Sequence, residues 1–171
     1  KEIAQKYEVL QAGQVVIDFG CAPGGWLQVA SEEVGDEGLV LGIDLLKVLP
    51  PSPNTRTMVA DVNQPGLVHL ILQEIHRKAD VVLSDLAPKV SGVWELDHTR
   101  QIDLTSQVVS YMPDILLPGG SAVFKAFEGE MLKPLIKRLQ KLFTKVHIAK
   151  PLASRRESSE IYLICLNYLG R

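Results

Sequence analysis

Short apolar runs alternate with longer amphipathic stretches along this chain of 171 residues, and this alternation restricts the fold more than any other feature. Seven runs are typical of buried strands: Val15–Phe19, Leu39–Asp44, Thr57–Ala60, Asp80–Asp85, Ser121–Phe127, Val146–Ala149 and Glu160–Leu166. Helical spacing predicts helices over Gly24–Val34, Gly66–Arg77, His98–Leu116 and Leu132–Phe143. Strands that alternate with helices in this way predict an α/β fold, with a mostly parallel sheet and helices on both faces.

The last two predicted strands are separated only by residues 150–159, which are too few for a helical crossover. We therefore expect the last strand to run antiparallel to the others, as is typical of Rossmann-like methyltransferases and unusual in dinucleotide-binding folds. Because 46% of the residues are hydrophobic, one domain over residues 1–171 can bury a substantial core. No apolar run has the length of a transmembrane helix, so we expect no membrane partner. The chain begins with Lys1 rather than Met, and we expect that its N-terminal segment is truncated.

Charge is unevenly distributed, although the net charge is only −2. The stretch 133–156 carries basic residues and no acidic one: Lys133, Lys137, Arg138, Lys141, Lys145, Lys150, Arg155 and Arg156. This asymmetry predicts a surface that faces a polyanion, but a solvated helix face would explain it equally well. The two cysteines, Cys21 and Cys165, form no metal-ligand pattern, and we expect buried thiols in a reducing compartment and no metal site.

A glycine-rich loop, Asp18-Phe19-Gly20-Cys21-Ala22-Pro23-Gly24-Gly25-Trp26, joins the first predicted strand to the first predicted helix. Glycine lets the backbone turn sharply and approach a ligand, and the start of the helix offers free N–H groups to an anion. The spacing fits the dinucleotide fingerprint Gly-x-Gly-x-x-Gly poorly, and no Gly-Lys-Ser/Thr of a P-loop follows. The loop therefore indicates a ligand site of another kind.

Acidic residues stand at the ends of the first three predicted strands, namely Asp18, Asp44 and Asp61. Asp44 is placed to accept hydrogen bonds from ribose hydroxyls, and Asp61 could contact an adenine amino group. Acids are also compatible with a cationic sulfonium cofactor. Each aspartate alone could equally be a helix cap or a turn residue. Three in succession beside a glycine loop favour a nucleoside site.

Three further charged residues, Asp85, Lys125 and Glu160, fall at the ends of the remaining central strands. Lys125 interrupts an otherwise apolar strand, and lysine is seldom buried without a partner. A lysine between two carboxylates predicts a charge-balanced cluster. Such a cluster could be catalytic or only a structural ion-pair network.

Four motifs occur in a fixed order: Asp-x-Gly-x-Ala-Pro-Gly-Gly-Trp at 18–26, Ser-Asp-x-Ala-Pro at 84–88, Phe-Lys at 124–125 and Ser-x-Glu-x-Tyr at 158–162. Together they closely resemble the FtsJ/RrmJ family of ribosomal RNA 2′-O-methyltransferases, over essentially the whole chain. The resemblance implies S-adenosyl-L-methionine as the cofactor. By motif, its binding residues are Gly24, Trp26, Asp44, Asp61 and Asp85, with Gly25 in the same loop.

The family uses a Lys-Asp-Lys-Glu tetrad, and Asp85, Lys125 and Glu160 match its last three members. The family's first lysine lies just upstream of a segment that Lys1-Glu2-Ile3 resembles, so we expect it to be missing here and a chain with these ends to be impaired. Lys125 would orient a ribose hydroxyl and take its proton, or stabilise the developing alkoxide. A base must be neutral whereas two carboxylates favour a charged lysine, so both roles stay open.

The segment 90–100 and the closing residues 167–171 resemble the α-proteobacterial and mitochondrial branch of the family. On that resemblance the substrate is a uridine in large-subunit ribosomal RNA, and the protein is an intracellular monomer, mitochondrial in a eukaryote or cytoplasmic in a bacterium. Lys89 and Arg100 flank the Asp85 loop and could bind phosphates. Trp94 could stack on a base or could simply pack against the protein.

Three alternatives compete with this prediction. A nicotinamide-dependent oxidoreductase is disfavoured by the glycine spacing and by the set of Asp85, Lys125 and Glu160. A non-catalytic RNA-binding or ribosome-assembly factor could keep the same fold. A 2′-O-methyltransferase could also act on transfer RNA or on a messenger RNA cap, because fold alone does not define the substrate.

Overall fold

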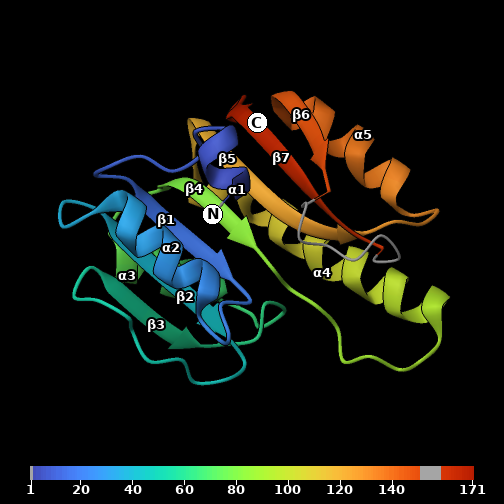
Figure 1. The fold of residues 1–171 in the computed structure, drawn as a ribbon, viewed down its shortest axis with the longest axis horizontal. Helices are drawn as coiled ribbons and strands as arrows, with labels where there is room; N and C mark the ends of the chain where they lie inside the picture. The colour runs from blue at the N-terminus through green and yellow to red at the C-terminus, as the bar shows by residue number, and fades with distance from the viewer. Residues whose placement is uncertain (1, 151–158) are drawn as a thin grey trace.

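The computed structural model describes residues 2–150 and 159–171, and its strands form one sheet in the order β3-β2-β1-β4-β5-β7-β6 (Figure 1). The strands are β1 (Val15–Phe19), β2 (Leu39–Asp44), β3 (Thr55–Val59), β4 (Ala79–Ser84), β5 (Leu116–Phe127), β6 (Phe143–Ala149) and β7 (Glu160–Tyr168). The helices are α1 (Glu2–Lys6), α2 (Gly25–Val34), α3 (Leu67–Ile75), α4 (Trp94–Ile115) and α5 (Leu132–Leu142).

The direction of the last strand confirms the expectation from the sequence. Strand β1 pairs in parallel with β2 and β4, β2 with β3, and β4 with β5. Strand β7 lies between β5 and β6 and is antiparallel to both. The carboxyl ends of the parallel strands and the start of β7 therefore meet at one edge of the sheet, where ligands bind in open α/β folds.

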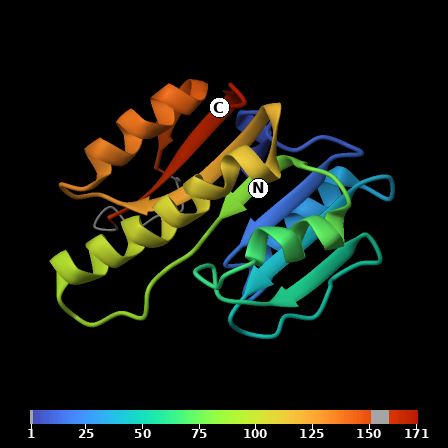
Figure 2. The same cartoon turned by 180° about the vertical axis from the view of Figure 1, so that it is seen from behind.

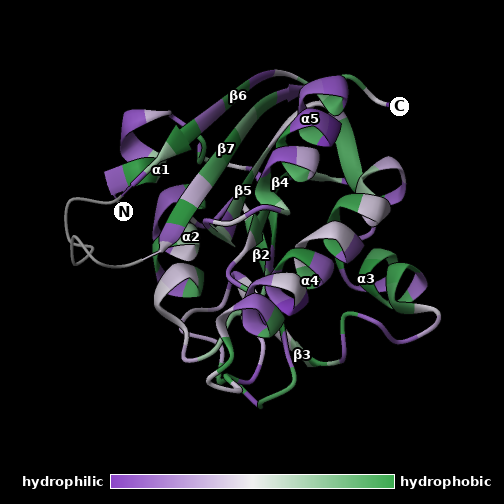
Figure 3. Ribbon diagram, turned by 90° about the vertical axis from the view of Figure 1, so that its right-hand side faces the viewer, coloured by the Kyte–Doolittle hydropathy of each residue, from purple (hydrophilic) through white to green (hydrophobic). Residues whose placement is uncertain are grey.

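Helices cover both faces of the sheet. Figure 2 shows α3, α4 and α5 in front of it, and Figure 3 shows α1 and α2 on the opposite side. One core packs Ile71, Met112 and Leu139 from α3, α4 and α5 against inward residues of the strands, and the other packs Leu27 and Val34 from α2. Both faces of the sheet can bury apolar residues under helices, because successive side chains of a strand point to opposite faces.

Several boundaries differ from the prediction for physical reasons. Helix α4 begins at Trp94 rather than His98, since Glu95 and Asp97 in its first turn favour a helix start. Strand β5 begins at Leu116 and continues through a Pro-Gly-Gly segment that is usually read as a turn, with a register shift opposite Ala79/Val81. Helix α1 was not predicted, because five residues are too few to show helical periodicity.

Half of the basic residues in the stretch lie on α5, whose exposed side carries Lys133, Lys137, Arg138 and Lys141. Its apolar residues Leu135 and Leu139 are buried on the opposite side. A helix with one buried side fits the solvated-face explanation as well as the RNA-facing one, so the latter stays a prediction. Arg155 and Arg156 lie outside the described residues.

Both cysteines are buried and free, as expected. In the described part of the chain, no helix has the length and apolar character needed to span a membrane. Among the same residues, no group of three His, Cys, Asp or Glu side chains is arranged to hold a metal ion.

Candidate active site

Lys125 lies in a recessed cluster with the two carboxylates that the sequence paired with it. Its Nζ atom is 3.1 Å from Asp85 Oδ1 and 4.0 Å from Glu160 Oε1, and its side chain is only 10% exposed. Burial raises the pKa of the Asp85 carboxyl, an effect that the neighbouring Lys125 ammonium opposes. The cluster unites residues from β5, the loop after β4 and the start of β7, which are far apart in the sequence.

The backbone around Lys125 is held by a buried glutamine. Strand β4 pairs with β5 only as far as Ser84 and Phe124, so the next residues of β5 lack a partner strand on that side. The Gln101 side chain of α4 takes its place, donating to the Lys125 carbonyl at 2.6 Å and accepting from the Phe127 N–H at 3.2 Å. Gln101 is fully buried, and its side-chain amide supplies a donor and an acceptor where a neighbouring parallel strand would otherwise supply them.

An acidic pocket of about 270 Å³ opens beside this cluster. Three of the predicted cofactor residues, Asp44, Asp61 and Asp85, line it together with the glycine-loop residues Gly20 and Ala22. It lies at the carboxyl edge of the sheet, where the sequence placed the site. Its size and its carboxylates suit a nucleoside with a cationic group.

Two of these aspartates also shape the loops that form the pocket. Asp44 accepts hydrogen bonds from the Ala22 N–H and from the Leu46 N–H, both at 2.9 Å, and so ties the glycine loop to the end of β2. Asp61 accepts from the Asn63 N–H at 2.8 Å in a local turn, two residues after β3 ends. The turn-residue explanation therefore holds for both side chains, and their free acceptor positions remain compatible with ligand binding.

Gly20 makes the close approach of the two central loops feasible. Its φ of +76° favours glycine, and a Cβ atom there would lie 2.9 Å from the Leu86 backbone nitrogen. The glycine loop therefore lies directly against the loop that carries Asp85.

Behind the pocket, Asp18 is fully buried, and neither of its carboxylate oxygens has a hydrogen-bond partner among the described residues. Burial raises its pKa well above the ordinary value, and the nearby carboxylates of Asp85 and Asp44 raise it further. A concentration of carboxylates of this kind is relieved by a positive ligand. The structure thus favours a cation in the acidic pocket.

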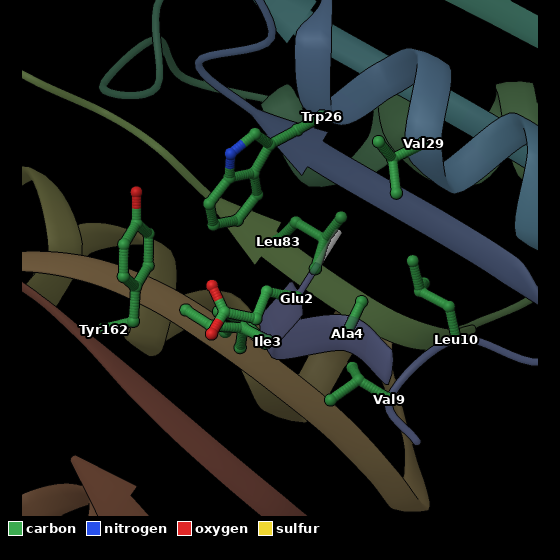
Figure 4. A pocket seen from close by; sticks show the side chains of 10 residues that line it. Glu2, Ile3, Ala4, Val9, Leu10, Trp26, Val29, Leu83 and Tyr162 are labelled. Carbon is green, nitrogen blue, oxygen red and sulfur yellow. The ribbon is translucent and has the colours of Figure 1, made fainter. Parts of the chain in front are cut away.

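Trp26 lies apart from the acidic pocket and lines a second, mainly apolar one of about 290 Å³. Figure 4 shows Trp26 and Tyr162 toward one end of this pocket and Val9 and Leu10 at the other. The rings of Trp26 and Tyr162 are 5.3 Å apart at 31°. Tyr162 is the cross-strand partner of Lys125, and burial together with Asp85 and Glu160 raises its pKa to about 12. Lys125 thus contacts Asp85, which lines the acidic pocket, and pairs across the sheet with Tyr162, which lines the apolar pocket.

The structure brings most of the predicted site residues together, and Gly24 and Gly25 stand at the start of α2 next to the loop that Asp44 holds. Tyr162 belongs to the motif at 158–162, but no role was predicted for it. Gln101 was not predicted at all. A polar residue on the buried side of an amphipathic helix was the available signal, since Gln101 shares that side with Thr105, Val108 and Met112.

The reversed strand β7 separates this sheet from dinucleotide-binding folds, and the pocket at its carboxyl edge suits an adenosyl sulfonium better than a dinucleotide. The class of protein is thus a Rossmann-like, S-adenosylmethionine-dependent methyltransferase. Within this class the chain belongs to the FtsJ-like methyltransferase family, whose model matches residues 1–168.

Curated relatives match almost the whole chain. The ribosomal RNA large subunit methyltransferase E of Methanocaldococcus jannaschii is 41% identical over 174 residues, which cover 99% of this chain and 71% of the relative. The protein of the same name from Cenarchaeum symbiosum is 41% identical over 170 residues and is covered to 86%. Both are archaeal, so the expected assignment to the α-proteobacterial and mitochondrial branch is not supported.

Solved structures agree with the fold. A Plasmodium falciparum protein described as a ribosomal RNA methyltransferase has a TM-score of 0.88 and 31% identity, over 99% of this chain and 94% of its own. A fibrillarin from Aeropyrum pernix, 14% identical, shares the architecture with a TM-score of 0.62 over 92% of this chain and 68% of its own. The predicted Rossmann-like methyltransferase fold is thereby confirmed.

Proposed function

We propose that this enzyme transfers a methyl group from S-adenosyl-L-methionine to a ribose 2′-hydroxyl of large-subunit ribosomal RNA, most specifically that of a uridine. Relatives with 41% identity carry the name ribosomal RNA large subunit methyltransferase E. The recessed cluster of Lys125, Asp85 and Glu160 supports a reaction at a hydroxyl group, because a hydroxyl needs a group that can hold or accept its proton.

The residues of the acidic pocket fit the cofactor. Asp44 and Asp61 would hold the adenosine part, and Asp85 would lie near the sulfonium. Gly24 and Gly25, next to the loop that Asp44 holds, would lie along its amino-acid part. Trp26, which lines the apolar pocket, is proposed from the family motif alone. The buried, unpartnered Asp18 side chain supports this assignment, because a cationic ligand in the pocket would favour its ionised form and oppose the burial that raises its pKa. When bound, the cofactor supplies an electrophilic methyl group.

Lys125 carries the central role in this proposal. Its Nζ atom would orient the ribose hydroxyl and either take its proton or stabilise the negative charge that develops on the oxygen. Asp85 and Glu160 would hold Lys125 in position from two sides, and Gln101 fixes the backbone from which it projects. Since the methyl group is already activated, orientation accounts for much of the rate enhancement.

The single observation that carries the proposal is the 3.1 Å contact between Lys125 Nζ and Asp85 Oδ1 at the margin of the acidic pocket. The experiment is to map 2′-O-methyl groups on unmethylated large-subunit RNA, small-subunit RNA, transfer RNA and capped messenger RNA. Each RNA is mapped with and without the enzyme and cofactor. We expect a new 2′-O-methyluridine in large-subunit RNA and none in small-subunit RNA, transfer RNA or capped messenger RNA. Modification confined to transfer RNA or a cap, or none in any of these RNAs, would contradict the proposal.

The exposed lysines of α5 and Lys89 and Arg100 beside the Asp85 loop are proposed as phosphate contacts. Binding as a monomer remains a prediction.

A further inference from the structure

Trp94 is an exposed aromatic residue close to the cluster, and the proposed chemistry gives it no role. It is the first residue of α4 and is 44% exposed. Its indole stacks on Phe127 with ring centroids 5.8 Å apart and on His98 with centroids 6.1 Å apart. We propose that the exposed surface of Trp94 is a stacking site for an unpaired RNA base adjacent to the methylated ribose, an inference that rests on the proposed function.

The position of Phe127 connects Trp94 to the reactive centre. Phe127 is two residues after Lys125 on β5, so their Cα atoms are separated by roughly 7 Å, and it is the cross-strand partner of Glu160. A base on Trp94 would thus lie beside the ribose that reaches Lys125. Because Lys125 is recessed, this ribose can enter only if the strand leaves its helical stack, which exposes the faces of neighbouring bases.

Buried polar groups hold Trp94 in place from both sides. Asp97 accepts from the Ser91 N–H at 2.9 Å, the Ser91 hydroxyl at 2.7 Å and the Gly92 N–H, which fixes the loop that leads into α4. His98 accepts from the Met131 N–H at 3.2 Å, which ties α4 to the loop after β5. A ring that is already fixed loses little conformational entropy when a ligand binds.

The surroundings of Trp94 suit a single-stranded nucleic acid. Val90, Val93, Leu96 and Met131 are exposed apolar neighbours in these segments, with exposed fractions of 76%, 54%, 40% and 44%. The exposed cations Lys89 and Arg100 stand in the same segments and suit phosphates. Aromatic rings that are interleaved with cations are the usual surface on which proteins bind single strands.

The test uses two substitutions at one position. Trp94→Leu keeps an apolar side chain but removes the ring, whereas Trp94→Phe keeps a ring. Binding is measured by fluorescence anisotropy with a labelled single-stranded oligouridylate of ten nucleotides, and KM and kcat are measured with unmethylated large-subunit RNA. Calorimetric binding of S-adenosylhomocysteine reports whether the cofactor site is intact. Leu70→Ala, at a 37% exposed position on α3, is the control for lost apolar surface.

We expect Trp94→Leu to weaken oligouridylate binding and to raise KM about tenfold, with kcat and cofactor affinity unchanged. Trp94→Phe should recover most of the loss, and Leu70→Ala should have no effect. The dependence of log Kd on log salt should be the same in Trp94→Leu as in the wild type, whereas Arg100→Ala should reduce this slope by about one.

Unchanged KM and RNA binding in Trp94→Leu would overturn the stacking site. Equal losses of RNA and cofactor affinity would also overturn it, because they would show that Trp94 only packs. If the wild type itself transfers no methyl group to large-subunit RNA, the proposed function fails, and the stacking site fails with it.

Discussion

The acidic pocket and the lysine cluster are adjacent, but the protein builds them in different ways. The pocket is formed mainly by loops that follow β1, β2, β3 and β4, and one of its internal contacts joins Asp44 to Ala22, only 22 residues away. The cluster joins Asp85, Lys125 and Glu160 across three strands and depends on the insertion of β7 between β5 and β6. The acidic pocket is therefore built almost entirely from the first half of the chain, whereas the lysine cluster depends on the whole topology.

The largest effect is expected for Lys125→Ala, which separates the two regions completely. Methyl transfer should fall about 10²–10⁴-fold, because the remaining members of the cluster are carboxylates, which cannot stabilise the negative charge that develops on the hydroxyl oxygen. Affinity for S-adenosylmethionine, measured by calorimetry, should change little. Lys78→Ala, which removes a lysine at the opposite end of β4 that contacts the Pro113 carbonyl, is the control. Wild-type turnover of Lys125→Ala would remove Lys125 from the mechanism.

Gln101→Leu tests whether the lysine cluster depends on long-range support. The change leaves the Lys125 carbonyl and the Phe127 N–H without their partner, which should lower the free energy of unfolding by about 2–4 kcal/mol. At temperatures well below melting, kcat should fall about tenfold, since the lysine is less well oriented, with unchanged cofactor affinity.

The matched control for Gln101 is Gln107→Leu, on the same helix, whose side chain donates a hydrogen bond to the Tyr111 hydroxyl. It should leave kcat unchanged. The free energy of unfolding is measured by chemical denaturation and kcat by steady-state assays. If Gln101→Leu lowers the free energy of unfolding but has the same kcat as Gln107→Leu, Gln101 contributes only to stability.

Asp44→Asn tests the pocket side of the comparison. Asparagine replaces one carboxylate oxygen with an NH₂ donor, so one of the two loop contacts loses its acceptor and the other keeps only a neutral one. The dissociation constant of S-adenosylmethionine should therefore rise about tenfold. At saturating cofactor, kcat should be close to that of the wild type. Asp36→Asn, an exposed aspartate in the loop after α2, is the control. A fall in kcat without a change in cofactor affinity would contradict the division into two regions.

Asp18→Asn should have the smallest effect on function, and it tests how protein stability and cofactor affinity depend on pH. Because the pKa of Asp18 is raised in the folded state, the stability of the free protein should be highest below the ordinary aspartate value and should fall as pH rises through the raised value. Affinity for the cationic cofactor should rise over the same range, by roughly fivefold for about 1 kcal/mol of attraction. In Asp18→Asn both trends should be weaker in urea unfolding and calorimetry at several pH values. Identical pH profiles would contradict the placement of a cation near Asp18.

The difference between the two regions also explains what the sequence could predict. The seven strands and the reversed β7 follow from local patterns and are confirmed. The motif residues Asp44, Asp61 and Asp85 line one pocket, and their cofactor-binding roles stay a prediction. The separation of Trp26 from the acidic pocket was not predicted, because the direction of a side chain at the start of α2 depends on tertiary packing. Gln101 was missed because its partners are backbone atoms 24 and 26 residues away, and backbone atoms leave no signature in a sequence.

The most direct test of the central claim is the chemical position of the methyl group that Lys125 helps to transfer. Large-subunit RNA is methylated with labelled S-adenosylmethionine and then hydrolysed in alkali, which cleaves next to every free 2′-hydroxyl. We predict that the label appears in alkali-stable dinucleotides for the wild type and is lost with Lys125→Ala. Label in mononucleotides would show methylation of a base and would contradict the account.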